Sequence, residues 1–275
     1  MATNTVRAQQ TGRTRPIKIN TITDEDLRQS LREGWRDFMS LRGDIFLAGL
    51  IYTFIGVAAV VVAMNGRLLP FLFPVLAGVG LLGPVAATGF YELARRREKG
   101  QDVHWFDFLE VRKRSSVDDM GIVAGVLLAI FFVWLVVAGA LYAALFQWVV
   151  PDSLRQFIDM VISTERGWML IGAGAVIGAI LGWIVLALSI VSLPLLVDCN
   201  VSAADALSTS WRAAHANMGV LIRWGLIVTL LLVLGSIPLF VGLAFVLPWL
   251  GYSTWHLYTR LVDRDSIPAK RRRRD

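Results

Sequence analysis

The sequence predicts an all-α membrane protein whose six transmembrane helices form three hairpins, accompanied by interfacial amphipathic helices. The chain is 56% apolar with a mean hydropathy of +0.60, whereas soluble domains are about 45–50% apolar. Five long apolar blocks separate the polar segments, and the last block is long enough for two helices. Of the 27 Lys and Arg residues, 24 fall on alternate polar segments. Because cytoplasmic loops retain Lys and Arg, both termini are expected in the cytoplasm.

Residues 1–23 are predicted to form a disordered basic tail. They contain four basic residues and no acid, and no apolar segment of signal-peptide length occurs before residue 45. An organellar transit peptide is the weaker alternative, since its composition is also rich in Arg and hydroxyl residues. We therefore exclude this tail from the membrane domain, which is expected to cover residues 24–262.

The first hairpin is expected to follow an amphipathic helix. Thr23 can cap that helix, and three acidic residues lie in its first turn, where the helix dipole favours them. Four large apolar residues recur on one of its faces: Leu27, Leu31, Trp35 and Phe38. Spans one and two are predicted at residues 45–64 and 68–91, joined by a tight turn.

The second hairpin begins after a basic loop, residues 92–120. The end of this loop, Ser116 to Asp119, resembles a helix-capping box. Spans three and four are predicted at residues 121–150 and 168–197. Their connection carries apolar residues at helical spacing from Leu154 to Ile162, which predicts a short amphipathic helix on the outer interface.

The third hairpin is predicted from the longest apolar block. Gly235-Ser236-Ile237-Pro238 interrupts this block, so spans five and six are expected at residues 218–235 and 238–259. Residues 263–275 are expected to form a basic C-terminal tail. An amphipathic helix precedes span five, because Ala203, Leu207, Trp211 and Ala214 repeat the spacing of the first such helix.

The hairpins resemble three degenerate copies of one unit. Trp35 and Trp211 are each followed by Arg and, eight residues on from the Trp, by glycine. Every second span also carries a proline toward its inner end, namely Pro84, Pro194 and Pro248. Chance similarity is the alternative, since Trp is common at membrane interfaces.

Two groups of residues within the spans are candidate functional features. Gly174, Gly178 and Gly182 form a ladder of the kind that lets two helices pack closely. A possible intramembrane polar site comprises Arg223, Glu92 and Asp198. Snorkelling of the Arg223 side chain to the cytoplasmic headgroups is the simpler interpretation. The alternatives are pairing with Glu92, Asp198 or Asp44, and contact with a substrate.

Lipid is the partner that the charge distribution favours. The basic residues flank membrane spans, where anionic headgroups on the cytoplasmic side are the nearest anions, so nucleic acid is not expected as a partner. A contact with headgroups is predicted for the basic run at the C-terminus: Lys270, Arg271, Arg272, Arg273 and Arg274. A membrane-protein partner is also compatible with this distribution.

Catalytic and metal-binding chemistry is not indicated. The sequence contains no Walker loop, HExxH, GxSxG or CxxC pattern. Its three histidines, His104, His215 and His256, lie in predicted loops or near span ends, and Cys199 is the single cysteine. We therefore expect no metal, no cofactor and no enzymatic activity.

The chain carries a family resemblance, and its landmarks lie in the C-terminal half. It resembles the domain-of-unknown-function 2189 family, uncharacterised bacterial inner-membrane proteins, over roughly residues 25–262. The landmarks are Leu193-Pro194-Leu195-Leu196, Val201 to Ala206, Ser210-Trp211-Arg212, Asn217, Pro248 and Trp255-His256-Leu257-Tyr258. The resemblance implies a six-span protein of a bacterial inner membrane and supplies no substrate, cofactor or catalytic residue.

The sequence thus predicts a non-enzymatic protein of the inner membrane that acts as an accessory, assembly or envelope-organising subunit. Few ionisable residues lie in the spans, and several Trp-bearing helices are expected at the interface. A transporter or channel for a small or amphipathic solute, gated at the three span prolines, is the alternative.

Overall fold

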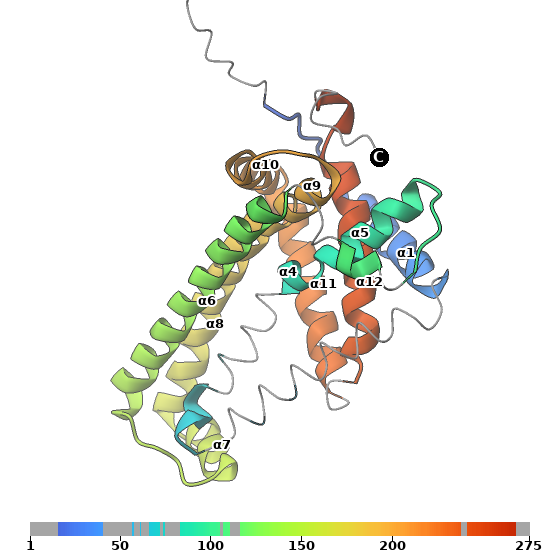
Figure 1. The fold of residues 1–275 in the computed structure, drawn as a ribbon. Coiled ribbons are helices and arrows are strands. Elements are labelled where there is room, and N and C mark those ends of the chain that lie inside the picture. The colour runs from blue at the N-terminus through green and yellow to red at the C-terminus, as the bar shows by residue number, and fades with distance from the viewer. Residues whose placement is uncertain are drawn as a thin grey trace, which may run out of the picture.

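The computed structural model describes residues 16–40, 66–71, 83–104, 107–110, 116–237 and 241–267, together with Val57, Val61 and Pro74. The regular structure within these residues is helical, with one isolated antiparallel bridge between Ile19 and Val262 (Figure 1). All of the predicted first span except Val57 and Val61 lies outside the described residues, as do residues 72, 73 and 75–82 of the second. The same holds for residues 1–15 and for Lys270 to Arg274.

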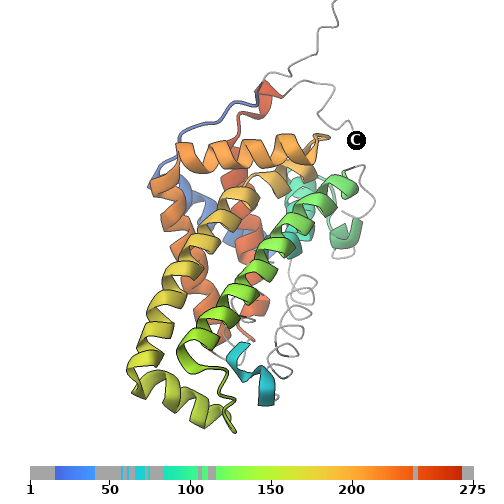
Figure 2. The ribbon, with the colours of Figure 1, turned by 90° about the vertical axis from the view of Figure 1, so that its left-hand side faces the viewer.

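A long helical hairpin forms one side of the molecule. Helix α6 (Val117–Phe146) and helix α8 (Glu165–Ser189) lie side by side, with α7 (Leu154–Ser163) at their far end (Figures 1 and 2). The predicted amphipathic helix between spans three and four is therefore present. Its N-terminus is capped by Ser153, whose side chain accepts a bond from the Gln156 N–H, and its buried Phe157 contacts Tyr142.

Pro194 marks a break in the fourth predicted span. Helix α8 ends at Ser189, and α9 (Ser192–Asp198) begins three residues later. A proline ring clashes with the carbonyl four residues earlier, here that of Ile190. The Val191 N–H, at this break, instead donates to Ser210 Oγ at 3.1 Å. Ser210 belongs to α10 (Ala203–Ala216), which lies across the ends of α8 and α9 (Figure 2).

The other prolines act differently. Pro84 lies in the short α4 (Gly83–Ala86), which is separated by Ala87 from α5 (Thr88–Glu98). Pro248 lies inside α12 (Leu243–Leu261) without interrupting it. A 3₁₀ helix, η1 (Gly66–Phe71), starts at the turn expected between spans one and two.

Helix α1 (Asp24–Ser40) packs along α12 in the antiparallel direction. Phe38 contacts Phe245, Trp35 contacts Trp249, and Arg260 donates to Ser30 Oγ. The expected cap is also present, since the Thr23 side chain and the Asp26 carboxylate each accept the backbone N–H of the other residue. The predicted amphipathic helix before span one is therefore bound to α12, the last long helix of the chain.

Three of the described helical segments are long and apolar enough to cross a membrane: Val117–Phe146, Glu165–Asp198 and Met218–Ser236. They correspond to predicted spans three, four and five. The last of them is α11. Helix α12 corresponds to span six but is more polar, and α1 covers much of it. Six spans remain a prediction.

The described parts of both predicted tails are packed together. The Asn20 N–H donates to the Leu261 carbonyl at 2.9 Å, and the Ile22 N–H to Asn217 Oδ1 at 2.8 Å. Ile17, Ile22 and Ile267 are buried, and a 3₁₀ turn, η3 (Arg264–Ser266), precedes Ile267. Residues 16–23 and 263–267 were assigned to tails because of their charge, but their isoleucines bury apolar surface instead.

The expected capping box at Ser116 does not form. The Ser116 hydroxyl donates to the Leu196 carbonyl at 2.7 Å, and the Asp119 carboxylate accepts the Ala203 N–H at 2.7 Å. Asp119 thus caps the N-terminus of α10 rather than that of its own helix. The dipole of α10 favours an anion at this position as much as the dipole of α6 would at its own N-terminus. Both side chains connect α6 to the α9–α10 segment.

Candidate functional site

The basic end of α5 lies beside α9 and α12 and reaches α1 through an ion pair. Its last turn reads Arg95, Arg96, Arg97 and Glu98. The helix approaches α12 closely, because a Cβ atom on Gly251 would lie 2.7 Å from the Phe90 Cβ. We call the ion pairs made by Glu92 and these four residues, together with the groups that they bridge to, the α5 network.

Glu92 is the buried anchor of the α5 network. Its side chain is 0% exposed and that of Arg95 is 3% exposed. Arg95 Nε lies 3.1 Å from Glu92 Oε2, and Arg96 Nε lies 2.9 Å from Glu92 Oε1. A buried carboxylate carries a large desolvation cost, which only paired and hydrogen-bonded cations can offset. The spacing of three and four residues places both arginines on the same helix face as Glu92.

Arg96 extends the network to the loop that follows α5. Its guanidinium lies 3.0 Å from Asp107 and also pairs with Glu110. Partial burial by itself would lower the pKa of Arg96, but the bonds to Glu92 and Glu110 and the charge of Asp107 outweigh burial and raise it. Phe108 of the same loop packs edge-on against Phe90. The loop is therefore held to α5 by both charge and packing.

Arg97 connects α5 to α1 and through it to α12. The distance from Arg97 Nε to Asp37 is 2.9 Å, and Asp37 also lies 2.7 Å from His256 Nε2. The other ring nitrogen of His256 lies 3.2 Å from Glu33. His256 of α12 thus lies between two carboxylates of α1.

Glu33 shows how this part of the network is balanced. Partial burial favours its protonated form, but the hydrogen bond and charge of Arg260, with His256 and Gln29, hold the pKa of Glu33 below its usual value. Arg260 lies 2.8 Å from Glu33 and 3.8 Å from Asp26. Glu33 is therefore charged at neutral pH, and α1 is held to α12 by alternating charges.

Glu98 and Asp198 connect α5 and α9 to the C-terminal segment. Glu98 accepts a bond from Trp255 Nε1 at 3.1 Å and pairs with Arg264. Asp198 accepts the Tyr258 hydroxyl at 2.9 Å and lies 3.7 Å from Arg264. Burial would lower the pKa of Arg264, but its bonds to Glu98 and the charge of Asp198 raise it well above the usual value.

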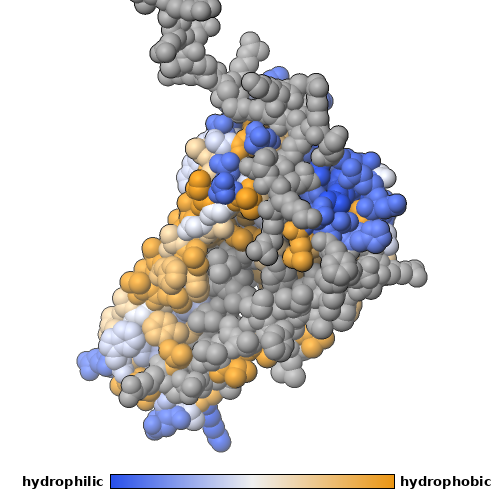
Figure 3. Space-filling model, in the orientation of Figure 1, coloured by the Kyte–Doolittle hydropathy of each residue, from blue (hydrophilic) through white to orange (hydrophobic). Residues whose placement is uncertain are grey.

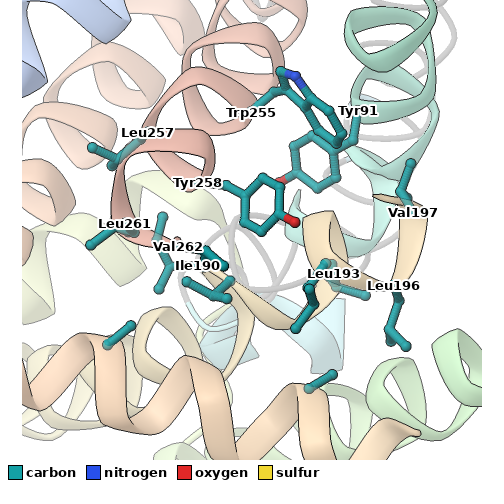
Figure 4. Close-up of a cluster of buried hydrophobic side chains, with 14 of the residues drawn as sticks. Tyr91, Ile190, Leu193, Leu196, Val197, Trp255, Leu257, Tyr258, Leu261 and Val262 are labelled. Carbon is teal, nitrogen blue, oxygen red and sulfur yellow. The ribbon is translucent and has the colours of Figure 1, made fainter. Parts of the chain in front are cut away.

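An apolar cluster lies beside the α5 network. Side chains of α5, α9 and α12 meet there, and Leu193, Leu196 and Tyr258 are fully buried (Figure 4). The aromatic rings of Tyr91 and Trp255 close the cluster on the α5 side. The α5, α9 and α12 ends are thus sealed against one another by tightly packed side chains.

In the structure, each residue of the proposed polar site has a partner outside that site. Arg223 lies 2.7 Å from Asp24 at the surface, and its side chain is 51% exposed. Glu92 is held by Arg95 and Arg96, and Asp198 by Tyr258 and Arg264. None of the alternatives weighed from the sequence included Asp24, because that pairing depends on where α1 packs.

The glycine ladder of α8 is largely open. A Cβ atom on Gly178 would lie 3.5 Å from the Trp134 ring, whereas one on Gly174 or Gly182 would meet no described atom within 4 Å. Close helix packing through Gly174 and Gly182 therefore stays a prediction.

The α1 side of this site was not predicted from the sequence. His256 was expected in a loop or near a span end, and Glu33, Asp37 and Arg260 were not singled out. The available signal was spacing, since Glu33 and Asp37, like His256 and Arg260, are four residues apart and share a helix face.

Among the described residues, no group of three or more His, Cys, Asp and Glu is placed to hold a metal ion. The paired charges can hold helices in register, and the described groups suggest no catalytic constellation.

Comparison with known proteins supports the membrane assignment. Residues 72–198 match a family described as predicted integral membrane protein, domain of unknown function 2189. The resemblance inferred from the sequence is confirmed over this stretch. No curated protein and no solved structure matches the chain.

Proposed function

We propose that this integral membrane protein works through contacts, as an accessory, assembly or envelope-organising protein of a bacterial inner membrane, and not as an enzyme. The observation that carries the proposal is the sealed meeting point of α5, α9 and α12 (Figure 4). A solute pathway at this point would need polar groups facing water, whereas these helix ends bury large apolar side chains and pair their charges.

We also propose that both termini and the α5 network lie on the cytoplasmic side of the membrane. It is supported by the distribution of Lys and Arg, 24 of 27 on alternate polar segments. Reporter fusions after residues 110 and 160 should report opposite sides of the membrane. Fusions that report the same side would contradict the topology on which the proposal rests.

A membrane-protein partner is expected to meet the cytoplasmic side. Leu109 and Trp211 are exposed, in the loop bound to α5 and on α10, and the proposed topology puts both on that side. A photo-crosslinking residue at either position, introduced into the full-length protein in cells, should give a discrete adduct that also co-purifies in mild detergent. The matched control is Trp168 near the start of α8, which is also exposed and is expected on the opposite side.

Transport is the alternative function, and a release assay with vesicles distinguishes it from the proposed contact role. Vesicles containing the full-length protein should release potassium ions and an amphipathic cationic dye no faster than empty vesicles. Faster release, combined with no adduct at Leu109 or Trp211, would replace the proposed contact role by transport.

A further inference from the structure

We propose that the outer face of α1 binds anionic phospholipid headgroups of the leaflet beside it. This inference rests on the proposed function and names one of its partners. Helix α1 sorts its charges between two sides. The acidic Asp26, Glu33 and Asp37 face cations of α5 and α12. The basic residues of the helix remain on the other side, in a row at intervals of four: Arg28, Arg32 and Arg36.

The basic row is open to the surroundings. The side chains of Arg28 and Arg32 are 69% and 71% exposed, and within the described residues they pair with Glu25 at 3.5 and 3.8 Å. Arg36 is also exposed. Exposed pairs at such distances contribute little and are easily exchanged. Three arginines and one carboxylate leave the row with a net positive charge.

Exposed apolar side chains lie beside this row. Trp35 is 41% exposed and Met39 is 48% exposed. Each follows an arginine of the row by three residues and therefore neighbours it on the helix surface. Trp35 also packs against Trp249 of α12. Arginines next to a half-exposed tryptophan are typical of helices that lie at a membrane interface, with apolar side chains toward the acyl chains and cations toward the phosphates.

Both ends of α1 are fixed near the ends of other helices. Asp24, in its first turn, pairs with Arg223, which lies five residues after α11 begins at Met218. At a rise of 1.5 Å per residue, that is only about 7.5 Å along the spanning helix. Asp37, in the last turn of α1, pairs with Arg97 at the end of α5. These two ion pairs hold the ends of α1 beside the start of α11 and the end of α5, where the proposed topology places the headgroups of that leaflet.

The test compares lipid binding by full-length variants in detergent. Native mass spectrometry would titrate wild-type protein with phosphatidylglycerol and, separately, with phosphatidylcholine. The wild type should prefer phosphatidylglycerol, and the triple variant R28Q/R32Q/R36Q should bind it more weakly, by about fivefold for each arginine at low salt. The variant R28K/R32K/R36K, which retains the charge, should bind phosphatidylglycerol much as the wild type does.

Two controls separate this site from other arginines. R155Q/R166Q removes exposed arginines near α7, at the far end of the α6–α8 hairpin, and should leave binding unchanged. A variant with Gln at Lys270 and Arg271 to Arg274 tests the C-terminal run. If that variant loses the preference while R28Q/R32Q/R36Q keeps it, the tail and not α1 is the headgroup site. Unchanged binding by R28Q/R32Q/R36Q overturns the inference, whereas the crosslinks at Leu109 and Trp211 test the proposed function independently.

Discussion

Replacing Glu92 by alanine is expected to lower the free energy of unfolding by about 3–5 kcal/mol. The substitution leaves Arg95 buried without its carboxylate and removes one of the bonds that hold Arg96. Removing one partner of a buried pair is costly because the remaining charge cannot regain its hydration. Unfolding of the purified protein by SDS in mixed micelles would measure the change.

Glu25 provides the matched control for Glu92. It also pairs with two arginines of its own helix, Arg28 and Arg32, but its side chain is 63% exposed. Glu25→Ala should therefore cost no more than about 1 kcal/mol. If Glu92→Ala costs as little as Glu25→Ala, water reaches the α5 network and its ion pairs do not hold the helices together.

The substitution Gly34→Ala is expected to displace α1 from α12. A Cβ atom at this position would come within 2.5 Å of the Ser253 backbone nitrogen and 2.7 Å of its Cα atom, besides contacting Ser253 Oγ. Overpacking of this kind costs about 1–3 kcal/mol and sometimes more. Limited proteolysis in detergent should show faster cleavage within α1, and SDS unfolding should show the lost stability.

Two further variants make the Gly34 prediction specific. Because the closest atoms include the Ser253 backbone, the double variant G34A/S253G should not recover wild-type stability. Gly182→Ala on α8 introduces the same methyl group where no described atom lies within 4 Å. It should be neutral or stabilising by up to about 1 kcal/mol, since alanine favours helix more than glycine does. Equal effects of Gly34→Ala and Gly182→Ala would contradict the close approach of α1 to α12.

The surface of the molecule is divided into an apolar part and a hydrophilic part. Apolar side chains cover the visible face of the α6–α8 hairpin, whereas hydrophilic residues gather around α1 and α5 (Figure 3). The exposed apolar residues include Phe132, Val136 and Val176. In an aqueous protein such a surface would promote aggregation, but in a bilayer it is the surface that lipid covers.

Local features of the fold were predictable because they depend on neighbouring residues. The helices at residues 117–146, 154–163, 218–236 and 243–261 match the predicted spans and the amphipathic linker to within a few residues. The caps at Thr23 and Ser153, and the helix break before Pro194, also follow from short-range chemistry. Glu92 finds both of its arginines within four residues of its own helix.

Pairings between distant segments required the tertiary structure. Tyr258 bonds to Asp198 across 60 residues, and Ser116 bonds to the Leu196 carbonyl across 80. Ser116 was predicted to cap its own helix, because a local partner was the only one visible in the sequence. The same limit explains why Asp24 was not considered for Arg223.

The sequence alone determined that this is an α-helical membrane protein, since apolar length and the distribution of Lys and Arg act through the surrounding bilayer and need no knowledge of packing. Only the tertiary structure decided that α1 binds α12, and hence which side of α1 is paired and which is free. An amphipathic pattern specifies that a helix has two faces, but the identity of the surface that covers each face depends on the other helices that the chain brings beside it.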